Sequence, residues 1–223
     1  MRFDEMLMHA MQQMQKFQES LYLVYALENK CQFESACDET FRLEDLAEKL
    51  IAITRGLTIC TGHPKAREML NAIIEANVPV TAEYTPEGWF KLCIPALLPR
   101  KERGNADYIL GYLHPAMQRF VDSNARRDFN KSVIIFRHIY DYQRPERLFR
   151  DHDNIEVNAV VDVLAHYLLR SDSPMRLAHF YDSVCGEVDC TEVYIVERYD
   201  YQRFLTALEN GEIGTPEVKP DPQ

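Results

Sequence analysis

The segment from Ser132 to Tyr140 constrains the fold most, because it is an almost continuous run of apolar and β-branched residues. Such residues suit the pleated surface of a sheet, so the run predicts a strand. Two stretches that alternate around Pro86-Glu87-Gly88 indicate a β-hairpin. Two further strands are predicted near residues 176–181 and 192–196. The chain is therefore expected to contain a small mixed sheet.

Helical periodicity dominates the rest of the chain. Apolar residues recur at steps of three and four over residues 4–29 and again over 43–57, which predicts two amphipathic helices joined as an antiparallel hairpin. Further helices are predicted at residues 65–77, 108–121, 154–169 and 199–208. We therefore expect an α+β protein with a helical region at 1–77, an α+β domain at 78–209 and a flexible tail at 210–223.

The first helix carries an apolar stripe with two interpretations. Its members are Leu7, Met11, Met14, Leu21, Val24 and Tyr25. The favoured interpretation is packing within the hairpin and against the rest of the protein, which is the usual fate of such a stripe. The alternative is a docking surface or the seam of a dimer.

Composition excludes several classes of protein. With 46% hydrophobic and 27% charged residues, the chain is ordinary for a globular protein and unlike a disordered one. No stretch approaches the roughly 18 apolar residues that cross a bilayer, and the first twenty residues are too polar for a signal peptide. We expect a cytoplasmic protein that spans no membrane, with its six cysteines reduced. The cysteine spacings do not favour zinc, and the common nucleotide and hydrolase motifs are absent from the sequence.

Charge is distributed unevenly along the chain. The formal net charge of −10 argues against non-specific attraction to nucleic acid. Residues 91–150 nevertheless carry a net charge of +6, and residues 151–223 carry −10. Such asymmetry within one chain indicates a binding partner.

The boundary between these two segments holds the most informative motif, Asp151-His152-Asp153-Asn154, directly before a predicted helix. Two carboxylates two residues apart could share one Mg²⁺ ion, which prefers oxygen ligands. The alternative, which the residues alone favour because Asp-rich helix starts are common, is that they cap the helix and interact with its N-terminal dipole. On the helix, Val157, Val160, Val161, Leu164 and Leu168 form the expected buried stripe. Asn154, Asn158 and Asp162 lie along another face and are expected to support the helix.

This segment resembles the signature of the RusA-type Holliday-junction resolvases. In that family Asp-x-Asp-Asn opens a helix that carries an Asp-Ala-Leu element, and an Asp-Asp pair follows. Asp151-His152-Asp153-Asn154 and Asp162-Val163-Leu164 are similar to the first two elements, and Asp172 falls where the acidic pair belongs. The resemblance covers about residues 79–197. The whole chain also resembles a family of proteins from bacterial mobile genetic elements without an assigned activity.

The resemblance implies a RusA-like fold and a structure-selective DNA endonuclease that depends on Mg²⁺ or Mn²⁺ and acts as a homodimer on branched DNA. Asp151, Asp153 and Asp172 would then be the catalytic metal ligands. The phosphate contacts would be Arg100, Lys101, Arg103, Arg144, Arg147 and Arg150. A solvated loop is the alternative for these basic residues.

The sequence departs from the family in three ways. The Lys that the family has on the first helical turn is absent, because Val157 and Asn158 occupy those positions, and the spacing to Asp162 is one residue longer. A single Asp172 replaces the acidic pair, and the net charge is negative. These departures favour an alternative function, namely a catalytically inactive RusA-like accessory factor that binds protein or nucleic acid. A purely structural module is a third possibility.

Overall fold

The computed structural model describes residues 3–101 and 105–213 and divides the chain into two compact units. We call residues 1–73 with 101–108 the helical unit, and residues 74–100 with 109–223 the sheet unit. This division falls inside a helix that we expected to belong wholly to the first domain. The structure has the expected α+β class. The predicted flexible tail lies outside the described residues from position 214 onward.

Two long helices build the helical unit, α1 (Phe3–Asn29) and α2 (Phe33–Cys60), and α3 (Ala66–Asn77) follows them. The connection between α1 and α2 is only three residues long, and Cys31 adopts a left-handed backbone with φ of 55°. The second helix therefore begins ten residues before the predicted Leu43. Its first turns are largely exposed and polar, so they lack the periodicity that reveals a buried face.

Five strands form the sheet in the order β1-β2-β5-β3-β4. They are β1 (Thr81–Tyr84), β2 (Phe90–Ile94), β3 (Ser132–Asp141), β4 (Leu177–Gly186) and β5 (Cys190–Glu197). All neighbouring pairs are antiparallel except β3 and β4, which run parallel from Ser132–Leu177 to Asp141–Gly186. This full-length pairing carries β4 five residues past the predicted end at Tyr181.

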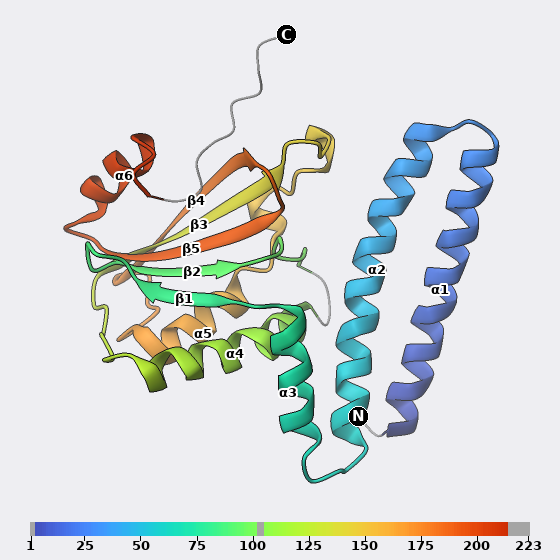
Figure 1. Cartoon of the computed structure of the whole chain (residues 1–223), viewed down its shortest axis with the longest axis horizontal. Coiled ribbons are helices and arrows are strands. Elements are labelled where there is room, and N and C mark those ends of the chain that lie inside the picture. The colour runs from blue at the N-terminus through green and yellow to red at the C-terminus, as the bar shows by residue number, and fades with distance from the viewer. Residues whose placement is uncertain (1–2, 102–104, 214–223) are drawn as a thin grey trace. The chain divides into compact units, whose positions relative to one another are not determined.

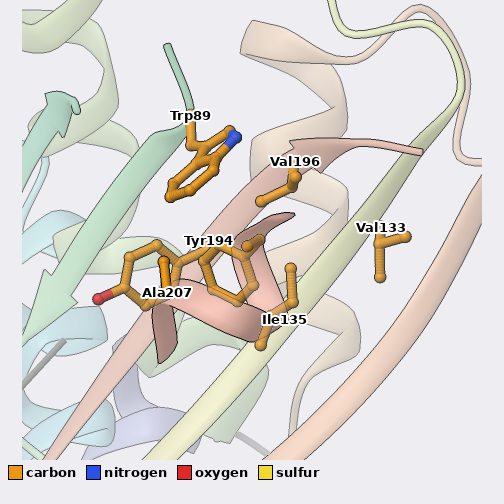
Figure 2. Packing of buried hydrophobic residues seen from close by; sticks show 7 residues of the cluster. Trp89, Val133, Ile135, Tyr194, Val196 and Ala207 are labelled. Atoms are coloured by element: carbon orange, nitrogen blue, oxygen red, sulfur yellow. The ribbon is translucent and has the colours of Figure 1, made fainter. Parts of the chain in front are cut away.

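Helices cover both faces of the sheet, as Figure 1 shows: α4 (Asn105–Ser123) and α5 (Asn158–Leu168) lie on one face and α6 (Tyr201–Glu209) on the other. Because helices cover β3 on both sides, nine of its ten residues are buried, which explains why its sequence is apolar throughout. Under α6, Trp89 packs its ring against Phe204 at a centroid distance of 5.2 Å. From the sheet, Val133, Ile135, Tyr194 and Val196 belong to the same cluster (Figure 2).

The segment between β3 and α5 differs from the prediction. Residues 154–157 do not belong to the helix, which begins at Asn158. Two short 3-10 turns precede it, η1 (Glu146–Leu148) and η2 (His152–Asn154). The Asp-x-Asp-Asn motif is therefore a turn in front of the helix and not its first turn. The buried stripe expected on α5 is confirmed, since Val157, Val160, Val161, Leu164 and Leu168 are all buried.

Candidate functional site at the acidic turn

The acidic turn, residues 151–154, lies beyond the C-terminal end of β3 on the way to α5. Asp151 and Asp153 are both exposed to solvent. The chain just after the turn is held against the loop that follows β2. The backbone N–H of Glu156 donates to the carbonyl of Pro99 at 2.8 Å, and Ile155 forms an isolated antiparallel bridge with Arg100. The backbone that carries the two carboxylates is therefore fixed at its C-terminal end.

Arg150 fixes the N-terminal end of the turn. Its guanidinium donates a hydrogen bond to the carbonyl of Leu98, and its backbone N–H donates to the Tyr140 hydroxyl at 3.1 Å. The Tyr140 ring stacks on Phe149 with a centroid distance of 4.3 Å. Burial raises the pKa of Tyr140, so the hydroxyl keeps its proton at neutral pH. Arg150 is thus a buried support, although the sequence suggested a phosphate contact.

His152, between the two aspartates, lies against the sheet. Its Nε2 is 2.8 Å from the Oγ of Ser183, and its ring stacks on Tyr181 with centroids 5.4 Å apart. Both partners belong to β4. This contact fixes the middle of the acidic turn, and the aspartates on either side of it are exposed residues.

Beneath His152 lies His138, which is only 1% exposed. The two ring centroids are 5.8 Å apart, and neither ring nitrogen of His138 has a hydrogen-bond partner within the described part of the chain. Burial, together with the nearby His152 and Arg150, lowers the pKa of His138 to about 4. The ring is therefore neutral at physiological pH. The sequence did not reveal this histidine pair, because no sequence spacing connects His138 of β3 with His152 of the acidic turn.

Asp172 lies elsewhere. It is an exposed residue between the end of α5 and the start of β4, whereas Asp151 and Asp153 precede α5. The helix of 11 residues between them is about 16 Å long. Among the described residues, no group of three or more His, Cys, Asp or Glu side chains is arranged to hold a metal ion. A single chain thus presents the predicted metal ligands as a pair with a distant third carboxylate.

The predicted phosphate contacts are in different environments. Arg144 forms a bidentate ion pair with Asp189 in the β4–β5 turn, so it joins two loops instead of facing solvent. Arg100 and Lys101 are exposed. Arg103 and the side chain of Arg147 lie outside the described residues. The three residues expected to support the helix, Asn154, Asn158 and Asp162, are all exposed, and only the last two lie on α5.

On the opposite face of the sheet is a buried charge cluster that the sequence did not reveal. Arg137 and Glu192 are 3% and 2% exposed, and their charged groups lie 3.6 Å apart. Lys91 is 2.8 Å from Glu192, and Asp182 is 3.3 Å from Arg137. The Tyr194 hydroxyl donates to the same Glu192 carboxylate at 3.0 Å. The polar interruption at Arg137 within the apolar run was the one available signal, and only the strand register identifies its partners.

The chain matches, over residues 2–217, the model of a family described as a family of unknown function (DUF6100), and it belongs to that family. No curated protein matches the chain. Among solved structures, the periplasmic domain of Helicobacter pylori MotB is similar at 13% identity, with a TM-score of 0.26. That match covers 56% of this chain and 85% of the other, and a score this low does not establish a common fold. No helix in the described part of the chain is long and apolar enough to span a membrane.

Proposed function

We propose that the sheet unit is a Mg²⁺-dependent, structure-selective DNA endonuclease domain of the RusA type. The observation that supports this proposal most directly is the acidic turn. Asp151 and Asp153 are exposed, while the intervening His152 is bound to β4 and the backbone after the turn is bound to the loop that follows β2. Carboxylates held on a fixed backbone meet the geometric requirement of a metal-dependent site. The order of strands and helices around the turn also agrees with the order predicted from the sequence patterns.

Two carboxylates are compatible with Mg²⁺, because this ion is commonly held by one or two protein carboxylates, several waters and the phosphates of the substrate. Asp151 and Asp153 would hold it. When bound, Mg²⁺ supplies an activated water and stabilises the charge on the leaving oxygen of a phosphodiester. Asp172 is not required for a site of this kind, although the sequence placed it there.

The other residues around the turn have supporting roles in this proposal. Arg150 and His152 orient the two aspartates through Leu98 and Ser183. Arg100 is exposed and its backbone bridges Ile155 just after the turn, so it is the best-placed candidate for a phosphate contact. A contact of this kind would hold DNA beside the acidic turn without reading its sequence.

The test is cleavage of a synthetic four-way DNA junction in Mg²⁺ or Mn²⁺ by the full chain and by three variants. Asp153→Asn should abolish cleavage, whereas Asp162→Asn, an exposed carboxylate on α5, should not change it. Asp172→Asn should also retain cleavage, because the proposed site uses two carboxylates. Cleavage that survives in Asp153→Asn, or an inactive wild-type chain, would disprove the proposal. Titration calorimetry of Mn²⁺ with and without the junction would show whether the ion binds only together with DNA.

A second function, a catalytically inactive accessory factor on the same fold, is favoured by two specific observations. Asp172 is separated from the acidic turn by the length of α5, and Arg144 and Arg150 have internal partners. This function predicts an intact fold, no cleavage and no Mn²⁺ binding that depends on Asp153. Tight, salt-sensitive binding of the junction would identify nucleic acid as the ligand of such a factor, and its absence would favour a protein ligand.

A further inference from the structure

The apolar stripe of α1 is exposed. Five members of the predicted stripe, Leu7, Met11, Met14, Leu21 and Tyr25, are between 41% and 67% exposed, and the sixth, Val24, is partly buried. The favoured interpretation was that the whole stripe packs within the hairpin and against the rest of the protein. Gln18 lies between Met14 and Leu21 and continues the spacing of four and three residues. We call the five exposed residues together with Gln18 the outer stripe of α1. Within the helical unit, the described residues leave it uncovered.

The contact between α1 and α2 uses other residues. Ala10 and Ser20 are the two buried residues of α1, and the Ser20 hydroxyl donates to the Glu39 carboxylate of α2. Met6 contacts the region of Gly56 and Cys60. At 100° per residue, the outer stripe is centred roughly 100° around the helix from this inner side. A helix with two apolar or small-residue seams about a quarter-turn apart is typical of a helix with two neighbours in a bundle. Within the helical unit, α2 accounts for one of these neighbours.

The spacing of the outer stripe identifies the kind of neighbour that is missing. Its six positions follow steps of 4, 3, 4, 3 and 4 residues, the a and d pattern of a coiled coil, over almost three heptads. No member is charged, and Gln18 is the one polar position, as in coiled coils where a single buried amide specifies the register. The charged residues of the central part of α1, Lys16 and Glu19, lie outside this stripe.

We propose that the outer stripe of α1 binds the same stripe of a second copy of this chain, so that two helical hairpins form a bundle through α1. A stripe that is uncharged and follows a coiled-coil repeat is complementary to itself. In a chain with a net charge of −10, it is a surface on which two copies meet without like charges in contact. A partner recognised by charge would find no charged group on the stripe.

The dimensions of α1 are sufficient for a dimer. Its 27 residues extend about 40 Å, and a helix is about 10 Å wide, so two copies would bury on the order of 1,000 Å² in total. This value reaches the lower limit for a specific interface. The proposal concerns the helical unit and does not depend on the endonuclease proposed for the sheet unit.

The experiment is sedimentation equilibrium of the full chain between about 1 and 100 µM. The wild type should be a dimer, and the double variant Met14→Glu/Leu21→Glu should be a monomer, because four glutamates would be buried across the seam. Ile51→Glu is the control, since it introduces one glutamate at an exposed apolar position of α2 and should remain dimeric. Far-UV circular dichroism should be equal for all three proteins.

Two results would overturn the proposal. A wild-type chain that is monomeric at 100 µM would mean that two copies do not bind through this stripe. A Met14→Glu/Leu21→Glu variant that stays dimeric with unchanged circular dichroism would place the interface elsewhere. Junction cleavage by a monomeric wild type would leave the function of the sheet unit intact and reject only the dimer.

Discussion

The two units of this chain bury their residues in opposite ways. In the sheet unit, β3 buries nine of its ten residues, and its burial includes Arg137 and His138. In the helical unit, the 27 residues of α1 bury only Ala10 and Ser20, and the large apolar side chains of the outer stripe remain exposed. The sheet unit therefore encloses polar side chains in its interior, whereas the helical unit exposes large apolar side chains to solvent. Apolar content alone therefore does not determine whether a unit buries its own apolar side chains.

The strongest test of this comparison is Arg137→Met in the sheet unit. Removing the guanidinium leaves Glu192 buried with Lys91 and deprives Asp182 of its partner, so we expect a loss of about 3–5 kcal/mol of unfolding free energy. Urea denaturation measures it. The control is Arg126→Met, which breaks an exposed ion pair with Asp128 and should cost less than about 1 kcal/mol. Equal effects of the two substitutions would show that the buried cluster is not important for stability.

A second test compares apolar truncations between the units. Ile134→Ala removes a fully buried side chain from β3 and should cost about 2–5 kcal/mol. Ile51→Ala removes a side chain that is 41% exposed on α2 and lies outside the outer stripe, and it should cost about 0.5 kcal/mol or less. Both values come from urea denaturation at one protein concentration. A large effect of Ile51→Ala would mean that the helical unit has a core that its burial does not reveal.

The pH dependence of stability tests the buried histidine. The pKa of His138 is lowered to about 4 in the fold, from an ordinary value of 6.5, so protons bind the unfolded chain more readily. The part of the unfolding free energy that comes from keeping His138 neutral is fully present above pH 6.5. It is lost as the pH falls toward 4, and the total loss is about 3 kcal/mol. His138→Leu should flatten the stability profile between pH 5 and 6.5. An unchanged profile would exclude His138 as its source.

The smallest expected effect concerns the support of the acidic turn. Ser183→Ala removes the hydrogen bond to His152 and should cost about 1 kcal/mol, because the bond is near the surface. If the acidic turn depends on this contact, the rate of junction cleavage should decrease by more than the loss of folded protein accounts for. Thr206→Ala is a suitable control, since it removes a hydroxyl bond within α6, far from the turn in sequence. Identical cleavage by Ser183→Ala and wild type would make the contact irrelevant to function.

Much of the fold could be predicted because local patterns matched the final packing. The β-branched run of β3 and the buried stripe of α5 are examples. The start of α2 could not be predicted, because its exposed turns have no apolar periodicity and Cys31 adopts a left-handed conformation that residues other than glycine rarely take. The full length of β4 depends on its pairing with β3, and pairing partners are not visible in a local pattern.

The candidate site was only partly predictable for the same reason. The two aspartates of the acidic turn were identified from their spacing and from the resemblance. Their supports come from contacts between distant segments: Arg150 with Leu98, and His152 with Ser183. Arg144 and Arg150 illustrate the limit, because a basic residue in a loop has the same local pattern whether it faces solvent or an internal acceptor.

The strand order has a consequence for how the chain is synthesised. β2 pairs with β5, so Phe90 must pair with Ile195 across more than a hundred residues, and the sheet cannot be completed until β5 has left the ribosome. The α1–α2 hairpin needs only contacts within the first sixty residues. We therefore expect the hairpin to form during translation, before β5 has emerged and the sheet can complete its pairing. The α1–α2 hairpin would then be structured before the sheet, at a stage when its apolar stripe is still uncovered.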